Sequence, residues 1–422
     1  MATDGNIPNW VEAKLLDLLE RGGFLSGDRG PVTSSLKLLN SDGLCSSMFR
    51  AVVESGRVRY NLMVKTLLNW RFDYYADMFI NESRMYQEVL PGLLGGHPEV
   101  HPFIPKCYGA MAEPGEGVIL MEDLSLQGFT HAPRTMDLEH ICFSLKALGR
   151  FHALSYAAKK TDMPKFLQEI VHRIHGALKD EYTQFFMGMI IRESSLHAIQ
   201  LFSTRFPEEA DKHSDAIKSL KQMIDDSLPK MLSSALAQSP LAVVCHGDFT
   251  RNNLMFRYGE DGKISDVKFV DFQMSRYSSP VVDISSVICI NTSPELRAAH
   301  LPDMLSAYHG GVVQSLSESL DCPPESLEGE FGLEAFQQEY RRGVLHGFCV
   351  ASFFTQAALE GPGCIPVLGS SDTRTAEDVL QFLRDKRLVY SEEVNRRLAV
   401  LVKEVLDSNY LEPLISYLQP PE

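Results

Sequence analysis

Alternating apolar and polar positions near the N-terminus predict a small antiparallel sheet. Two such runs, 48–54 and 57–67, flank a short turn at 55–56, and 117–121 is a further strand-like run. In the segment 57–67, one face carries apolar side chains and the opposite face carries Lys65 near the end of the strand. These patterns predict a hairpin followed by a third strand.

Helical periodicity dominates the rest of the chain. A helix is predicted after Pro8, and another over 74–90, where Glu82 interrupts an otherwise apolar stripe. Beyond residue 122 the pattern is mainly helical. We therefore expect an α+β fold with two lobes, a small antiparallel-sheet lobe over 1–121 with a leading helix and a large helical lobe over 122–422.

Two short polar motifs interrupt the helical region. His246-Gly247-Asp248, with Asn253 five positions after the aspartate, precedes strand-like residues, and a second strand-like run ends at Asp271-Phe272-Gln273. The Asp-Gly sequence between the two runs is a hairpin signal. A hairpin returns the chain to its start, so we expect Asp271 to lie near Asn253.

Phosphoryl transfer requires this combination of groups. A carboxylate orients and deprotonates the attacking hydroxyl, and oxygen ligands hold Mg²⁺ against the nucleotide phosphates. Asp248 is the candidate base, and Asn253 and Asp271 are the candidate metal ligands. The spacing follows the kinase pattern H-R-D-x-x-x-x-N with D-F-G, although Gly247 and Gln273 depart from it. The alternative is a surface loop with two unrelated fragments.

The motifs resemble the aminoglycoside phosphotransferase and choline kinase superfamily, and most closely the ecdysteroid kinase-like family. The resemblance extends over roughly residues 40–400. The residues that carry it are His246-Gly247-Asp248, Asn252-Asn253-Leu254-Met255-Phe256, Asp271-Phe272-Gln273, Ser279-Pro280-Val281-Val282-Asp283, Met121-Glu122-Asp123-Leu124 and Phe151-His152-Ala153. It implies a bilobal protein kinase-like fold, the use of ATP and Mg²⁺, and a lipophilic alcohol such as an ecdysteroid or a xenobiotic as acceptor.

Lys65 and Glu82 are candidates for a second part of the site. In kinase-like folds a strand lysine contacts the α- and β-phosphates and pairs with a helix glutamate. A carboxylate in a buried stripe is costly unless a charged partner meets it, so Glu82 is the expected partner of Lys65. The alternative for Lys65 is a solvated lysine at a strand end.

The remaining candidates are supporting groups. Ser46 and Ser47 lie in a loop that could hold phosphate oxygens, although an ordinary hairpin loop is an equal alternative. Glu122 and Leu124 lie at an expected hinge, where backbone groups would bind adenine. We expect His246 to be a buried structural histidine. The resemblance implies that Asp283 braces the loop through backbone N–H groups, and the alternative is a helix N-cap.

Composition excludes several other functions. The net charge of −15 argues against a nucleic-acid-binding protein. The eight cysteines are scattered without a metal-ligand pattern, which favours free thiols in a reducing compartment. The N-terminus lacks an apolar signal core, and no apolar run is long enough for a membrane span. We therefore expect a cytoplasmic protein, and a monomer.

The acceptor is expected to be a small molecule. Eleven residues separate Asp271 from Asp283, too few for the activation loop and A-P-E motif of protein kinases. An apolar and aromatic run within 340–358 is by default core packing, with a pocket wall for a hydrophobic alcohol as the alternative. The competing hypothesis for the whole protein is a non-catalytic pseudokinase that binds nucleotide or a steroid-like ligand.

Overall fold

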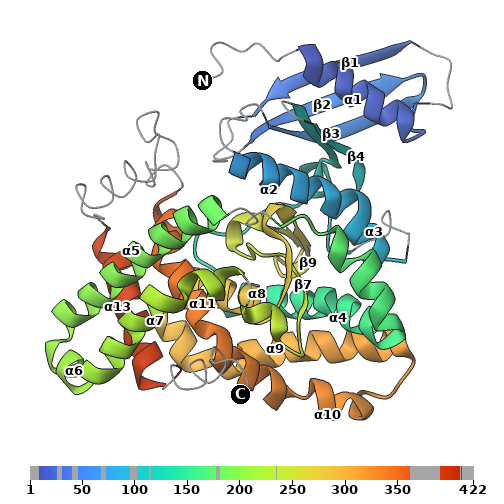
Figure 1. Ribbon diagram of the computed structural model, residues 1–422. Helices are drawn as coiled ribbons and strands as arrows, with labels where there is room; N and C mark the ends of the chain where they lie inside the picture. Colours follow the sequence, from blue (N-terminus) through green and yellow to red (C-terminus); the bar gives the residue numbers. More distant parts are fainter. Residues whose placement is uncertain are drawn as a thin grey trace. The chain divides into compact units, whose positions relative to one another are not determined.

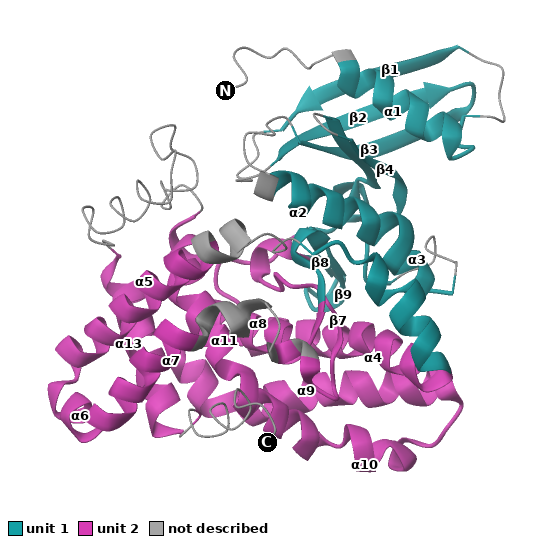
Figure 2. Cartoon of the chain, in the orientation of Figure 1, with its two compact units in different colours: residues 1–130, 162–177, 255–276 teal, residues 131–161, 178–254, 277–422 magenta. Residues whose placement is uncertain are grey.

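The chain forms two compact units. The computed structural model describes residues 9–25, 31–39, 46–67, 73–95, 102–113, 116–176, 181–233, 235–361, 390–408 and 410. Unit 1 combines three segments, Met1–Thr130, Asp162–Ala177 and Met255–Arg276, and unit 2 combines the other three, His131–Thr161, Leu178–Leu254 and Tyr277–Glu422 (Figure 2). The chain therefore passes between the units several times.

A five-stranded sheet is the centre of unit 1 (Figure 1). The strand order is β1-β2-β3-β5-β4, and each neighbouring pair is antiparallel. The predicted small antiparallel sheet is thus confirmed. Its strands are β1 (Val32–Leu38), β2 (Ser47–Ser55), β3 (Val58–Leu67), β4 (Cys107–Glu113) and β5 (Glu116–Glu122).

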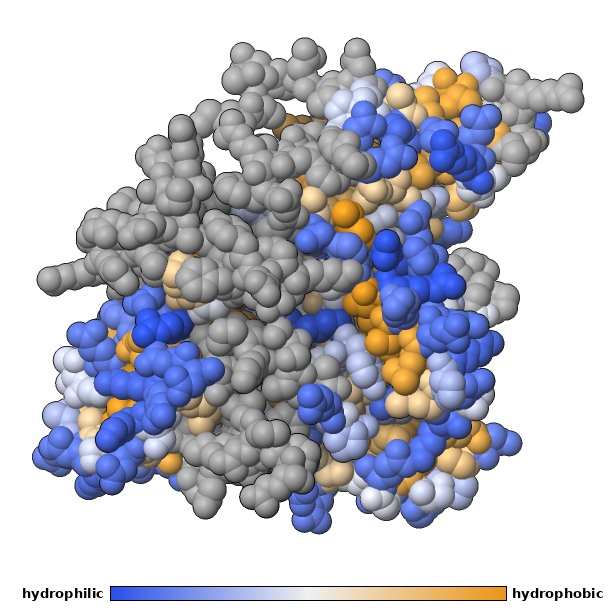
Figure 3. Space-filling model, viewed as in Figure 1, coloured by the Kyte–Doolittle hydropathy of each residue, from blue (hydrophilic) through white to orange (hydrophobic). Residues whose placement is uncertain are grey.

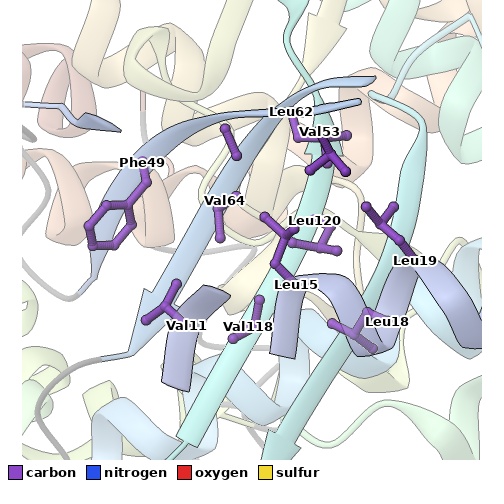
Figure 4. Close-up of a cluster of buried hydrophobic side chains, with 11 residues drawn as sticks. Val11, Leu15, Leu18, Leu19, Phe49, Val53, Leu62, Val64, Val118 and Leu120 are labelled. Atoms are coloured by element: carbon purple, nitrogen blue, oxygen red, sulfur yellow. The ribbon is translucent and has the colours of Figure 1, made fainter. Parts of the chain in front are cut away.

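Helix α1 (Asn9–Arg21) covers one face of this sheet. Its apolar side chains pack against alternate residues of the strands, because successive strand residues point to opposite faces. Figure 4 shows this core, which buries Val11, Leu15, Leu18 and Leu19 of α1 against Phe49, Val53, Leu62, Val64, Val118 and Leu120. Leu62 and Val64 belong to the face of the segment 57–67 that was predicted to be apolar.

Helix α2 (Asp73–Arg84) contacts strands β3, β4 and β5. The same helical path continues as a π-helix, η1 (Met85–Val89), and ends in α3 (Leu90–Leu93). The helix predicted over 74–90 is therefore present but is not α-helical throughout. A π-helical turn contains one more residue than an α-helical turn, and such turns are frequent at functional sites.

The predicted hairpin is confirmed. Strands β8 (Leu254–Tyr258) and β9 (Ile264–Phe269) are neighbours in one sheet, and the backbone N–H of Gly259 donates to the carbonyl of Lys263 at 2.9 Å. β9 ends two residues before Asp271, which is thus not the last strand residue as predicted. A 3₁₀ turn, η7 (Phe272–Met274), follows Asp271.

Unit 2 is mainly helical, as expected for the second lobe. Two of its helices, α4 and α9, approach so closely that a Cβ on Gly149 would lie 2.2 Å from the carbonyl oxygen of Tyr308, and one on Gly311 would lie 2.1 Å from that of Lys146. The helices are α4 (Leu138–Glu169, which crosses into unit 1 at the non-helical residue Asp162), α5 (Glu181–Arg205), α6 (Pro207–Lys212), α7 (Ser214–Ser233), α8 (Val281–Asn291), α9 (Pro294–Leu320), α10 (Glu328–Phe331), α11 (Leu333–Glu360) and α13 (Glu392–Asp407).

Most of the apolar run in 340–358 belongs to the core of unit 2. Leu345, Phe348 and Phe353 of α11 are buried, while Val350 and Phe354 are partly exposed. Helix α11 packs against α8, every residue of which is buried. The default interpretation of this run, core packing, thus holds for its three buried residues.

Among the described residues on the face shown in Figure 3, hydrophilic residues predominate and apolar patches lie between them. Among the described residues, no helix is both long enough and apolar enough to cross a lipid bilayer.

Candidate functional site

Lys65 is the centre of a charged cluster inside unit 1. Its Nζ donates to Oε2 of Glu82 at 2.6 Å and to Oδ1 of Asp271 at 2.9 Å. The expected contact between Lys65 and Glu82 is therefore present, and Lys65 is buried rather than a solvated strand-end lysine. We call Lys65, Glu82 and Asp271 the lysine cluster. It joins strand β3, helix α2 and the segment that follows β9.

Burial and charge act against each other in this cluster. Burial raises the pKa of Glu82 to about 7, with a further contribution from the charge of Asp271, and the ammonium of Lys65 opposes both. For Lys65, burial alone would lower the pKa, but the two carboxylates outweigh it and hold the pKa above its ordinary value. Lys65 thus stays charged, and it is shared between two acids.

Asp271 has an unusual backbone conformation. Its φ is 69° and its ψ is 66°, in the left-handed region that few non-glycine residues adopt. Such a residue cannot continue a strand, which explains why β9 stops before it. Strained backbone of this kind persists where the surroundings determine it, and it is frequent at functional sites.

The loop 246–253 follows strand β7 (Val243–Cys245) in unit 2. The side chain of Asp283, in the first turn of α8, accepts hydrogen bonds from the backbone N–H groups of His246 at 2.7 Å and Gly247 at 2.8 Å. His246 is buried, and its Nδ1 accepts from the backbone N–H of Asp248 at 3.3 Å. Gly247 has a φ of 86°, which explains why glycine replaces the arginine of the kinase pattern here.

Asn253 holds Asp248 within the loop. Its Nδ2 donates to Oδ2 and to the backbone carbonyl of Asp248, both at 2.9 Å. Since Nδ2 already donates these two hydrogen bonds, Oδ1 is the atom of the Asn253 side chain that can bind another partner. The 3₁₀ turn η6 (Arg251–Asn253) places Asn253 directly before strand β8.

The available atoms fit a hard cation. Within the described residues, neither Oδ1 of Asn253 nor Oδ2 of Asp271 has a hydrogen-bond partner. In each of these side chains, the other polar atom already makes a hydrogen bond, so the free atom is an oxygen. Oxygen is the ligand atom that Mg²⁺ prefers. Each side chain by itself can thus offer an oxygen to a cation, and metal binding by Asn253 and Asp271 stays a prediction.

A buried network behind the loop was not anticipated from the sequence. His152, from α4, contacts Oδ2 of Asp283 through Nε2 at 3.1 Å and the hydroxyl of Tyr308 through Nδ1 at 2.9 Å. All three side chains are fully buried. Burial would raise the pKa of Asp283, but the hydrogen bond and charge of His152 hold that pKa below its usual value. The close crossing of α4 and α9 at two glycines brings these partners together.

The polar atoms of His152, Cys245 and Asp283 all lie within 4.8 Å of one another. Such a group could in principle hold a metal. Each atom is already engaged, because Cys245 donates to the carbonyls of Ser278 and Ser279 at 3.5 and 3.3 Å. We therefore interpret the group as a hydrogen-bonded brace.

The expected hinge lies at the end of β5. The carboxylate of Glu122 accepts from the backbone N–H of Lys106 at 2.8 Å and from Gln127 at 2.6 Å, so this side chain is used inside unit 1. In the described part of the chain, no acceptor is bonded to the backbone N–H of Leu124. Asp123 orders the turn by accepting from the N–H of Ser125 at 3.1 Å.

The structure describes only part of the expected phosphate loop. Ser47 is the first residue of β2 and pairs with Thr66 of β3, and Ser46 directly precedes it. Residues 42–45 of the same loop lie outside the described residues.

The small antiparallel sheet, the mainly helical second unit and the two polar groups agree with a protein kinase-like fold. A model of the ecdysteroid kinase-like family matches residues 40–320, about two thirds of the sequence. The chain belongs to this family, as the motifs suggested, and membership supports a small-molecule kinase. No protein with a curated description matches the sequence.

Solved structures show distant similarity, and two of them serve as examples. Ethanolamine kinase from Plasmodium vivax matches with 14% identity and a TM-score of 0.41, covering 85% of this chain and 83% of that chain. A putative fructosamine-3-kinase from Haemophilus somnus matches with 13% identity and a TM-score of 0.32, covering 82% of this chain and 96% of that chain.

Proposed function

We propose that this protein is an ATP-dependent kinase that transfers the γ-phosphate to a hydroxyl group of a lipophilic alcohol, such as an ecdysteroid or a xenobiotic. The observation that carries the proposal is the lysine cluster. A buried lysine shared by a helix glutamate and an aspartate has a high desolvation cost, and kinases use this arrangement to bind nucleotide phosphates.

Each residue has a separate role in this proposal. Lys65 binds the α- and β-phosphates, and Glu82 fixes its position. Asp248 orients the acceptor hydroxyl and accepts its proton. Asn253 and Asp271 supply oxygen ligands for Mg²⁺, which neutralises charge on the phosphates when it is bound. His246 and Asp283 hold the loop 246–253 through the backbone contacts described above.

The nucleotide base and phosphates have further candidate partners. We assign adenine to the hinge, through the backbone of Glu122 and the free N–H of Leu124. Ser46 and Ser47 remain proposed phosphate contacts. In this scheme residues 1–121 form the nucleotide-binding lobe and residues 122–422 carry the loop 246–253 and the acceptor pocket.

A small acceptor agrees with the short connection after Asp271. Between Asp271 and Asp283 the chain forms η7, strand β10 (Arg276–Ser278) and the start of α8, which leaves no room for a peptide-binding activation loop. The lipophilic character of the acceptor rests on the family. We further propose a monomer in the cytoplasm, where the described cysteines, all free thiols, would stay reduced.

Ecdysteroids and model alcohols, incubated with Mg·ATP and the protein, test the proposal by mass spectrometry. We expect a gain of one phosphate on at least one alcohol and none with Asp248→Asn. The alternative is a pseudokinase that binds nucleotide or a steroid-like ligand without turnover. It would give nucleotide binding by calorimetry, no phosphorylated alcohol and no ATP consumption.

A further inference from the structure

Asn81 is a buried polar residue of α2 directly before Glu82. Its Nδ2 donates to the backbone carbonyls of Gln273 at 3.0 Å and Ser275 at 2.9 Å. Its Oδ1 accepts from the backbone N–H of Gly176 at 2.9 Å. The side-chain amide therefore uses both N–H groups and its oxygen, and each of these three bonds goes to a backbone group.

These bonds join the three chain segments of unit 1. Asn81 lies in the segment Met1–Thr130, Gly176 in Asp162–Ala177, and Gln273 and Ser275 in Met255–Arg276. A second contact supports the same arrangement, since Nε2 of His175 lies 2.7 Å from Oδ1 of Asp77, one helical turn before Asn81. The face of α2 that carries Asn81 is thus where the segments meet.

The segment bonded to Asn81 begins with the strained residue Asp271. Helix α2 and the π-helix η1 that continues it contact this segment at three points. Glu82 reaches Asp271 through Lys65, the ring of Tyr86 meets the ring of Phe272 edge-on at 5.7 Å between centroids, and Asn81 holds Gln273 and Ser275. The hydrogen bonds from Asn81 to Gln273 and Ser275 hold the backbone that follows Asp271. They therefore restrict the backbone conformation of Asp271 itself.

We propose that Asn81 is a positioning residue that holds the backbone of 271–275, so that Asp271 presents its carboxylate to Mg²⁺. The proposal deepens the function given above and rests on it for the identity of the metal ligand. Asn81 does not touch Asp271. It acts through two carbonyl groups that follow Asp271 in the chain, and an amide suits this role because two donors face two acceptors.

Asn81→Asp separates this role from general stability. The aspartate keeps the size of the side chain and an acceptor for Gly176, but it has no donor for Gln273 and Ser275. Asn81→Leu removes all three bonds. Ser83→Ala is the matched control, since Ser83 is a buried residue of the same helix and bonds to Gln87 instead.

The measurements are local hydrogen–deuterium exchange and the Mg²⁺ concentration at half-maximal nucleotide binding. In Asn81→Asp we expect exchange at 271–276 to rise by ~10-fold or more, the Mg²⁺ requirement to rise by ~10-fold, and nucleotide affinity at saturating Mg²⁺ to change little, as for the loss of one or two buried hydrogen bonds. Asn81→Leu should show larger effects and Ser83→Ala neither.

Two outcomes would overturn the proposal. One is unchanged exchange at 271–276 in Asn81→Asp. The other is faster exchange throughout unit 1 with an unchanged Mg²⁺ requirement, which would mean that Asn81 serves folding alone. If nucleotide binding by the parent protein is independent of Mg²⁺, the proposed function itself fails, and the exchange at 271–276 still decides whether Asn81 holds the segment.

Discussion

Nζ of Lys65 lies 2.9 Å from Oδ1 of Asp271, although the two residues are 206 positions apart in the sequence. The same ammonium group lies 2.6 Å from Glu82. One buried cation therefore compensates two carboxylates, and the cluster carries a net negative charge as long as both acids are ionised. The position and the charge of each of the three side chains therefore depend on the other two.

Lys65 and Glu82 should act as one unit. We expect Lys65→Met and Glu82→Ala each to lower kcat/KM, and the double variant to lose much less than the sum, with a coupling energy of ~1–3 kcal/mol. Steady-state kinetics of the four proteins measures this. The exposed pair Arg173 and Glu88, 3.2 Å apart, is the control cycle and should be close to additive. Additive losses in the first cycle would show that the contact has no role in turnover.

The raised pKa of Glu82 predicts a pH-dependent stability. The folded protein binds the Glu82 proton more tightly than the unfolded chain does. Its contribution to stability is therefore full below the unfolded pKa of ~4.5 and is lost as pH rises through about 7. Relative to Glu82→Gln, the parent protein should lose on the order of 3 kcal/mol of unfolding free energy over this range.

Denaturant unfolding of both proteins between pH 4.5 and pH 8 checks this prediction. Glu20→Gln, at an exposed position of α1, is the control and should follow the parent at every pH. A parent protein that gains stability relative to Glu82→Gln as pH rises would show that Lys65 dominates and that Glu82 stays ionised.

The hydroxyl of Tyr308 should affect the loop 246–253 from a distance. Tyr308→Phe leaves Nδ1 of the buried His152 without its partner, which costs ~1–3 kcal/mol of stability. Because His152 also contacts Asp283, we expect kcat to fall several-fold while KM for ATP stays close to the parent value. Tyr60→Phe loses a comparable 2.7 Å bond to the carbonyl of Phe24 in unit 1, and serves as the control. Equal loss of kcat in both variants would contradict a specific route to the loop.

Periodicity and turn chemistry were sufficient to predict three of the five strands of the unit 1 sheet, the hairpin of β8 and β9, and the helical character of unit 2, whereas β1 and β4 were not predicted. Lys65 and Glu82 could be paired from the sequence because each is a charged residue at an unusual position. Lys65 lies near the end of a strand, and Glu82 interrupts the apolar stripe of a helix. The conformation of Asp271 could not be predicted, since a left-handed aspartate has no signal in a strand-like run. The same holds for the π-helical turn at Met85–Val89.

Contacts between distant segments were the other gap. The bonds of Asn81 and the link between His152 and Tyr308 depend on how helices cross, and local patterns carry no information on crossing. A weak signal existed in both cases. Asparagine is unfavourable inside a helix, and Gly149 and Gly311 in α4 and α9 permit a close approach of backbones.

The two aspartates of the proposed site should be separable by experiment. Removing the Asp248 carboxylate leaves the metal ligands and Lys65 in place, so Asp248→Asn should still bind Mg·ATP while turnover falls by ~10²–10⁴-fold, the usual range for general acid–base help. Asp271→Asn removes a charge that offsets Mg²⁺, so metal-dependent nucleotide binding and turnover should fall together. Nucleotide titration with and without Mg²⁺, with single-turnover rates, measures both effects. If Asp248→Asn loses Mg·ATP affinity while Asp271→Asn keeps it, the two roles are reversed, and parent-like turnover in both variants would place the active site elsewhere.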